Sequence, residues 1–457
     1  MHLDLQLQLP AGTGRRVALE STLREAIRSG RLDADSSLPS SRSLAADLGV
    51  SRSTVVAAYE QLTAEGYLES AHGSGTRVAA SRRRAPAALD VDLFGPAPAH
   101  DFRPGEPDAS SFPRARWLRS VRRVLDGAPD AALGYPDPRG IAELRETIAG
   151  YIRRTRTVDT DRAGVRITGG YGAGLGLLAE TFRRRGMTRI GVEDPTLPIY
   201  TQLLRSVGLR TVPIQVGDEG IDLDQLAEAD VGAVVVTPAH QFPTGVTMSP
   251  TRRSELVEWA RRADTWIVED DYDGEYRHDR RPIGALQGLA PDRVIYAGTA
   301  SKSLSPALRL GWLVVPSELR DDLLRVSNVR SAVSAIDQLV LADFIDRGEF
   351  DRHVRKMRFV YGRRSTELRA MLADAAPWLR LGDGSAGLHL TGVLDRDAPR
   401  ETEVLAACTA GSVGVLGLVT DLGASVAGPG LAIGFSRPSQ HHFPTALTEF
   451  ADALATL

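Results

Sequence analysis

Residues 298–311 read GTASKSLSPALRLG, and Lys302 stands at the centre of this stretch. Lysine is rare in the chain, because only Lys302 and Lys356 occur among the 55 Lys and Arg residues. An arginine keeps its proton, whereas a lysine that is removed from water can lose its proton and attack an aldehyde. The scarcity of lysine favours a chemical role for Lys302, and chance survival of two lysines is the alternative.

The composition indicates a folded chain of two or three domains. Its 457 residues exceed one ordinary core, and 42% hydrophobic with 25% charged residues exclude a largely disordered protein. A formal charge of -3 excludes a molecule coated in positive charge, so any nucleic-acid site must be local. A single cysteine, Cys408, excludes a disulfide framework and a multi-thiolate zinc cluster, and we expect no metal. Without a secretion signal or a long apolar run, we expect a cytoplasmic protein with no membrane contact.

A stretch rich in alanine, proline and arginine, residues 79–100, separates a short N-terminal part from a long C-terminal part. Because proline stiffens the chain, we interpret this stretch as a semi-rigid linker. Residues 101–457 alternate Val-rich runs such as VGAVVVTP with amphipathic runs such as SELVEWARRA. This rhythm predicts an α/β large domain, a mostly parallel sheet wrapped by helices, with a small C-terminal α+β subdomain from about residue 378.

The N-terminal part, residues 1–78, has a helix-turn-helix pattern. Apolar residues recur at one-turn spacing in two consecutive segments, Leu44 and Leu48 and then Val55, Tyr59 and Leu62. Ser41 and Ser51 stand where N-caps are expected, and Gly49 stands in the turn between the helices. A small helical bundle with solvated arginines is the alternative.

Candidate DNA contacts follow from this pattern, at the start of the second helix and on a glycine-tipped wing: Arg42, Arg52, Ser53, Thr54, Gly73, Gly75 and Arg77. The N-terminal end of a recognition helix meets base edges in the major groove, and a wing meets the DNA backbone. Residues 23–78 resemble the winged-helix domain of GntR-type bacterial regulators, through PSSRSLA at 39, LGVSRSTV at 48, AYEQLTAEGYL at 58 and GSGT at 73. The resemblance implies operator DNA as a partner.

The surroundings of Lys302 supply what pyridoxal phosphate (PLP) requires, namely an amine, a carboxylate for the ring nitrogen and a phosphate site. Asp270 and Asp271 end a strand-like run in TWIVEDDYDGEY, where ligands of parallel sheets collect, and Tyr272 follows. Phosphate candidates are the hydroxyls of Thr299 and Ser301, the side chain of Arg309, and the amides of Tyr171 and Gly172 in the turn ITGGYGAG. A solvated acidic loop and an ordinary glycine turn are the alternatives.

The ordered motifs resemble fold-type I aminotransferases: DFRPGEPD at 101, LGYPDPRGIAELR at 133, TPAHQFPTG at 237, EDDYDGEY at 269 and GTASKSL at 298. With the winged helix in front, the chain resembles a MocR-type regulator over nearly its whole length. The resemblance implies that Lys302 forms the internal aldimine, Asp270 partners the pyridine nitrogen, Tyr272 lies near the phenolic oxygen and His240 near the ring. It also implies phosphate ligation by Thr299, Ser301 and Arg309, and a head-to-tail, domain-swapped homodimer in which Tyr135 reaches the partner's phosphate.

Two departures from the family pattern bear on function. In the segment DPTL at 194, Leu197 replaces the aromatic residue that stacks on the pyridine ring. In LAIGFS at 431, Ala432 replaces the arginine that clamps a substrate carboxylate, a loss of about 1.5–3 kcal/mol. Arg437 lies at an odd offset from Ala432, so on a strand it would face the other side.

These features predict a DNA-binding transcription regulator whose aminotransferase-like domain senses PLP or a PLP-reactive, amino-acid-like ligand without ordinary turnover. Because the clamp is missing, PLP itself is a candidate signal, as in relatives that regulate vitamin B6 metabolism. The alternative is a PLP-dependent aminotransferase that carries a DNA-binding appendage. A second alternative keeps DNA binding but uses a dead cofactor site only for dimerisation.

Overall fold

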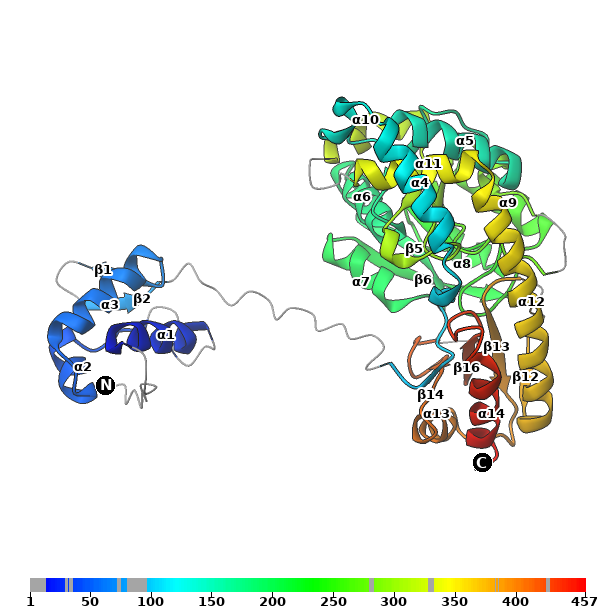
Figure 1. The fold of residues 1–457 in the computed structure, drawn as a ribbon. Helices are drawn as coiled ribbons and strands as arrows, with labels where there is room; N and C mark the ends of the chain where they lie inside the picture. Colours follow the sequence, from blue (N-terminus) through cyan, green and yellow to red (C-terminus); the bar gives the residue numbers. More distant parts are fainter. Residues whose placement is uncertain are drawn as a thin grey trace. The chain divides into compact units, whose positions relative to one another are not determined.

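The computed structural model describes residues 14–28, 32, 36–71, 75–79, 97–278, 283–327, 333–382, 384, 386–424 and 428–457. The chain divides into two compact units, residues 1–95 and 96–457, and each is described by itself (Figure 1). The predicted DNA contact Gly73 and most of the predicted linker, residues 80–96, lie outside the described ranges. Within those ranges, no helix has the length and apolar character needed to cross a bilayer.

The first unit contains three helices and a two-stranded antiparallel hairpin. Its elements are α1 (Arg15–Arg28), α2 (Ser41–Leu48), α3 (Arg52–Ala64), β1 (Leu68–Ala71) and β2 (Gly75–Val78). Its core draws on all five elements and includes Leu19, Leu44, Val55, Leu68 and Val78. Each helix turns an apolar stripe inward, as the one-turn spacing requires, so the predicted helix-turn-helix followed by a hairpin is confirmed.

Serine and glycine caps fix the ends of α2 and α3. Ser51 caps α3 as predicted, because its hydroxyl accepts a hydrogen bond from a first-turn amide at 3.2 Å. Gly49 ends α2 in the left-handed conformation, with a φ of 62°, also as predicted. The N-cap predicted at Ser41 is wrong by one residue, because Ser40 caps α2 and Ser41 is its first helical residue. The two adjacent serines carry the same hydroxyl, and only the backbone geometry distinguishes them.

The second unit is built on an eight-stranded mixed sheet. In spatial order its strands are β4 (Val165–Thr168), β11 (Gly311–Val314), β10 (Val294–Thr299), β9 (Trp266–Asp270), β8 (Ala233–Val236), β5 (Arg189–Asp194), β6 (Arg210–Gly217) and β7 (Gly220–Ile221). From β10 to β6 the strands are parallel, whereas β11 and β7 are antiparallel to their neighbours. Every residue of β9 and β10 is buried, which explains their continuous apolar runs.

Helices cover both faces of this sheet (Figure 1). They are α4 (Arg114–Gly127), α5 (Ala142–Arg156), α6 (Tyr171–Arg184), α7 (Pro198–Ser206), α8 (Leu223–Glu228), α9 (Pro250–Arg262), α10 (Ser317–Val326) and α11 (Ala335–Asp346). Ile267 and Val268 are neighbours in β9 but enter different cores, the first with α9 and the second with α6. The predicted mostly parallel sheet wrapped by helices is therefore confirmed.

A smaller antiparallel sheet follows the long helix α12 (Glu349–Ala375). Its strands are, in spatial order, β12 (Leu379–Leu381), β13 (His389–Leu394), β16 (Gly430–Gly434) and β15 (Leu416–Gly417). Helices α13 (Glu401–Ala410) and α14 (Phe443–Leu454) share a core with this sheet, and Cys408 is buried there. Phe350 of α12 packs into the core beside the large sheet, and Leu368 of α12 packs into the core of the small sheet. The helix α12 therefore contributes to both cores (Figure 1).

A short parallel pair joins the start of the second unit to its C-terminal part. Strand β3 (His100–Asp101) pairs with β14 (Val413–Gly414). Just beyond β3, the Gly434 amide at the end of β16 donates a hydrogen bond to the Phe102 carbonyl oxygen at 2.6 Å. This pairing fixes the segment after β3, which contains Gly105 and Glu106, beside the end of β16.

Candidate functional site

The predicted DNA contacts within the described ranges lie at the start of α2 and α3 and on the hairpin. Five are exposed and one, Thr54, is half-buried; the exposed ones are Arg42, Arg52, Ser53, Gly75 and Arg77. Arg52 begins α3, so its side chain projects from the helix end that meets base edges when such a helix enters a major groove. Arg77 lies on β2 opposite Glu69.

Three predicted cofactor residues, Asp270, Thr299 and Lys302, lie at or just beyond the carboxyl ends of two neighbouring parallel strands. Asp270 is the last residue of β9 and pairs in register with Ala297 of β10. Thr299 ends β10, and Lys302 follows in the next turn. Ligands of open parallel sheets collect at this edge. The strand order therefore brings Asp270 and Lys302 together, and each alters the pKa of the other.

The Lys302 amine lies against the segment that follows β3. Its Nζ donates a hydrogen bond to the Gly105 carbonyl oxygen. A β-carbon at Gly105, where φ is 114°, would stand 3.7 Å from Nζ. Burial lowers the pKa of Lys302, and the carboxylates of Asp270, Asp273 and Glu106 oppose this shift. A lowered pKa increases the fraction of neutral amine, which is the nucleophilic form.

Asp270 is a buried carboxyl with an unused acceptor. Only 7% of the residue is exposed, and its Oδ1 atom has no hydrogen-bond partner. The charge of Asp270 acts on the nearby Tyr171 hydroxyl. Burial raises the pKa of Asp270 well above its usual value, and the nearby Lys302 opposes this shift. An unpartnered buried oxygen is costly, and a ligand that brings a hydrogen-bond donor would satisfy it.

The N-terminus of α6 forms an anion site next to Asp270. Gly170 precedes the helix with a φ of 92°, and the amides of Tyr171 and Gly172 are the first of the helix, so they have no partner within it. The guanidinium carbon of Arg309 stands 4.0 Å from the place of a β-carbon on Gly170. Free amides and a guanidinium group thus face one small region.

Tyr200 of α7 also lies at this region, and sequence reasoning missed it. Its ring packs edge-to-face against Tyr171, with ring centroids 4.9 Å apart. The charges of Asp270 and Arg309 both act on its hydroxyl. The signal in the sequence was weak, because the family pattern has its aromatic residue at the position of Leu197, and Tyr200 lies three residues further on.

These groups fit PLP. The aldehyde would meet Lys302, the ring nitrogen would place a donor at the free oxygen of Asp270, and the phosphate would meet the start of α6 and Arg309. The hydroxyls of Thr299 and Ser301 lie 3.0 Å apart beside Lys302 and would add two donors. When bound, PLP would supply an electrophilic carbon conjugated to an electron-withdrawing ring.

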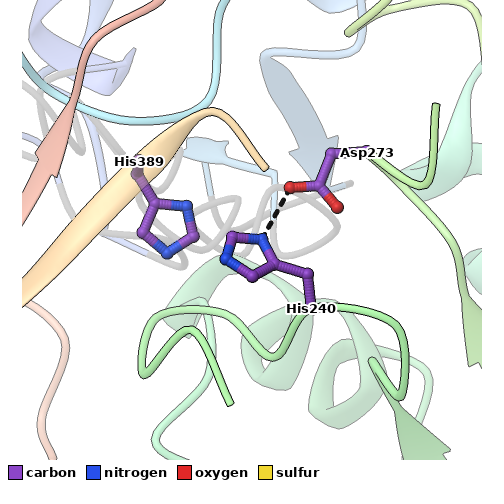
Figure 2. A group of neighbouring side chains, drawn as sticks. All are labelled: His240, Asp273 and His389. Atoms are coloured by element: carbon purple, nitrogen blue, oxygen red, sulfur yellow. Dashed lines mark hydrogen bonds and ion pairs between the residues drawn. The ribbon is translucent and has the colours of Figure 1, made fainter. Parts of the chain in front are cut away.

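A polar network adjoins Asp270, and Figure 2 shows the His240 ring between Asp273 and His389. His240 Nδ1 lies 2.8 Å from Asp273 Oδ2 and 3.1 Å from the Tyr272 hydroxyl oxygen. One atom from each of His240, Asp273 and His389 lies within 4.8 Å of the others, which is close enough to consider a metal ion. Sequence reasoning named Tyr272 and His240 but missed Asp273, which lies inside the EDDYDGEY motif, and His389, which comes from the distant strand β13.

The predicted substrate-clamp position is apolar. Ala432 is fully buried in β16, in a cluster with Phe242, Leu416, Leu418 and Leu422. Leu197 and Tyr272 pack against the same cluster.

Arg437 does not replace the missing clamp. Its guanidinium group pairs with Glu106 at 2.7 Å and with Asp101. The positive charge of Arg437 is therefore paired with two carboxylates in and just after β3.

Two family models match the chain, one in each unit. The model for bacterial regulatory proteins of the gntR family matches residues 16–78, and the model for aminotransferases of class I and II matches residues 106–410. Among solved structures, a multiple substrate aminotransferase from Thermococcus profundus has a TM-score of 0.71 at 22% identity, covering 82% of this chain and 96% of that chain. The second unit therefore has the fold of the PLP-dependent aminotransferases.

Curated relatives share both units. A probable rhizopine catabolism regulatory protein, MocR of Rhizobium meliloti, is 37% identical over 85% of this chain and 83% of its own. The pyridoxine biosynthesis regulator PdxR of Corynebacterium glutamicum is 31% identical over 96% of this chain and 95% of its own.

A gntR-type helix-turn-helix unit followed by an aminotransferase-type unit defines a class of DNA-binding transcription regulators. The relatives that match along most of the chain are named as such regulators. The chain belongs to the MocR-type regulators of the gntR family.

Proposed function

We propose that this regulator acts in the cytoplasm, holds PLP covalently on Lys302 and converts cofactor occupancy into a change of operator affinity. The observation that carries the proposal is the unpartnered oxygen of buried Asp270, whose charge acts on the buried Lys302 amine. A buried carboxyl oxygen without a hydrogen-bond partner costs free energy, and a ligand that brings a donor would offset this cost. A ligand shifts a conformational equilibrium only through different affinities for the two states, so the PLP-loaded and PLP-free forms must differ in structure or flexibility.

The apolar surroundings of Ala432 favour PLP itself as the signal. An α-amino acid that placed its carboxylate at the position of Ala432 would set this charge against the apolar side chains of Phe242 and Leu416. The relative PdxR is named as a regulator of pyridoxine biosynthesis, which supports a similar role in vitamin B6 metabolism here.

The PLP-loaded protein should not convert amino acids. We expect a panel of amino acids to leave the visible absorbance of the bound cofactor unchanged, because Ala432 cannot hold a carboxylate. Absorption spectra recorded over hours after mixing provide the measurement. Conversion to the pyridoxamine form would support the second candidate, an aminotransferase with a DNA-binding appendage, which the fold of the second unit favours.

The DNA contacts belong to the same proposal. Arg52, Ser53 and Thr54 would meet base edges, because they occupy the first turn of α3. Arg42 and Arg77 are exposed and would meet phosphates, and Gly75 would let the hairpin approach the DNA backbone.

Exposed apolar side chains on α4 and after it support a homodimer. Leu118 and Leu125 lie seven residues apart on one face of α4 and are 50% and 51% exposed. Leu133 and Tyr135 follow, 59% and 95% exposed. We propose that a second copy covers this surface in a head-to-tail, domain-swapped arrangement, with Tyr135 reaching the partner's phosphate site.

Charges on this surface should separate the dimer. We expect the double substitution Leu118→Glu and Leu125→Glu to yield a monomer, because two buried charges without partners would cost several kcal/mol. Sedimentation velocity gives the mass of each species. Leu289→Glu is the matched control, since Leu289 is 51% exposed on a different segment, and it should remain dimeric. A double variant that sediments as a dimer would contradict this interface.

A further inference from the structure

Residues 102–108, which follow β3, are held by side chains from the C-terminal part of the second unit. The Ser436 hydroxyl, just beyond β16, donates a hydrogen bond to the Glu106 carbonyl oxygen at 2.6 Å. The guanidinium group of Arg437 pairs with the Glu106 carboxylate at 2.7 Å. These contacts fix the middle of the segment beside the end of the small sheet.

The helix α12 holds the far end of the same segment. Arg364 of α12 pairs with the Asp108 carboxylate at 2.9 Å, and both side chains are only 1% exposed. The Asp108 amide donates a hydrogen bond to the Tyr361 hydroxyl oxygen at 3.0 Å. The Arg364 guanidinium group also donates to three carbonyl oxygens just beyond β16, those of Phe435, Ser436 and Pro438. The segment and the end of β16 are therefore joined through one buried arginine.

Lys302 reaches the middle of this segment from the large sheet. It lies in the turn after β10, and its Nζ atom donates a hydrogen bond to the Gly105 carbonyl oxygen. Among the described residues, this is the one hydrogen bond that the Gly105 carbonyl oxygen accepts. The charge of the adjacent Glu106 also acts on the Lys302 amine. The hydrogen bond therefore links the large sheet to a segment that the small sheet holds.

The Lys302 amine cannot donate to Gly105 and hold PLP at the same time. When an amine condenses with an aldehyde, its nitrogen forms a double bond to the aldehyde carbon, and the aldehyde oxygen leaves as water with both amine hydrogens. The bonded nitrogen keeps at most one added proton, which lies beside the neighbouring phenolic oxygen of the ring. The Gly105 carbonyl oxygen would then lack its donor, and because Gly105 is half-buried, water is the available replacement.

We propose that the Lys302 amine ties residues 102–108 to the large sheet in the PLP-free protein and that covalent binding of PLP releases them. This inference rests on the proposed function and names a conformational change through which occupancy of the site is registered. The contacts of Ser436 and Arg364 keep the released segment with the small sheet. Because the second unit begins at residue 96, the release occurs within its first residues, close along the chain to the stretch that leads from the first unit.

Hydrogen–deuterium exchange of the full-length protein, followed by mass spectrometry, tests the release. The reporters are the amides of Phe102, Arg103 and Asp108, which have hydrogen-bond partners in the structure. Saturating PLP should accelerate their exchange in the wild type by about 3- to 10-fold, the effect expected from the loss of one hydrogen bond that stabilises the segment. Peptides from α9 provide the internal reference and should exchange at the same rate with and without PLP.

Two substitutions at Lys302 separate the lost hydrogen bond from other effects of the cofactor. Lys302→Met keeps an unbranched side chain of similar length but has no donor, so this variant without PLP should exchange as fast as the PLP-loaded wild type. Lys302→Arg keeps hydrogen-bond donors but cannot condense with an aldehyde, so it should exchange as slowly as the PLP-free wild type. Neither variant should change its exchange rate when PLP is added.

The inference would be overturned by exchange that PLP slows or leaves unchanged in the wild type. Slow exchange in PLP-free Lys302→Met, equal to that of Lys302→Arg, would also overturn it, because the hydrogen bond to Gly105 would then not hold the segment. A wild-type protein that takes up no PLP would refute the proposed function itself. The comparison of the methionine and arginine variants needs no cofactor and would still decide whether Lys302 holds the segment.

Discussion

Lys302→Ala should abolish covalent retention of PLP. The alanine variant lacks the amine that bonds to the aldehyde, and the chain offers one other lysine side chain, Lys356 on exposed helix surface. After incubation with PLP and reduction with borohydride, the wild-type protein should carry one added cofactor on the peptide that contains Lys302. The variant should carry none there, and its visible absorbance should be lost.

Lys356→Ala is the matched control for this experiment. It removes the same charge and the same functional group from α12 and should retain the full adduct. An adduct of equal yield in Lys302→Ala would contradict the assignment of the amine. It would also favour the alternative in which the aminotransferase-like unit serves only for dimerisation.

Asp270→Asn should weaken PLP binding by about 10- to 150-fold. The neutral amide cannot keep the ring nitrogen protonated, and a charge-assisted hydrogen bond contributes about 1.5–3 kcal/mol. The substitution should have the opposite effect on the stability of the cofactor-free protein. Burial opposes ionisation of Asp270, and its Oδ1 atom is unpartnered, so the variant without PLP should be at least as stable as the wild type. Fluorescence titration gives the Kd for PLP, and thermal unfolding gives the stability.

Asp321→Asn is the control for this substitution, because Asp321 is exposed on α10 and should affect neither quantity. A wild-type Kd in Asp270→Asn would show that this carboxyl does not meet the cofactor. A large loss of stability in the cofactor-free variant would instead indicate a structural role for Asp270.

The sequence was sufficient to predict the two units, the sheet and the strand ends that carry the candidate site. Buried strands leave continuous apolar runs, so the end of β9 and the place of Asp270 could be read directly. The start of α6 followed from a glycine turn between a strand and a helix. Apolar spacing in the first unit predicted α2 and α3, because burial of one helix face fixes that spacing.

Contacts between distant segments could not be predicted. His389 reaches His240 only because the backbone at Gly387, just before β13, lies close to the His240 ring. Neither the strand register nor this close approach of the backbone can be read from a sequence. Tyr200 was missed for a similar reason, since its position depends on how α7 leaves β5. Ser40 and Ser41 carry the same side chain, so the choice of helix cap between them lay in the backbone alone.

The proposed function couples two sites that lie in different units, so it requires a coupling free energy between them. Typical couplings of 1–3 kcal/mol change an affinity by about 5- to 150-fold, and the effect is reciprocal. A protein in which PLP alters operator affinity must also bind PLP with a different affinity when DNA is present.

The most direct test is the Kd for operator DNA with and without PLP, measured by fluorescence anisotropy on a site selected by the full-length protein from random sequences. We predict at least a fivefold difference for the wild type and none for Lys302→Ala. Arg52→Ala should weaken both forms alike, which shows that binding occurs through α3. Equal operator affinities of the PLP-loaded and PLP-free wild-type protein would contradict the account.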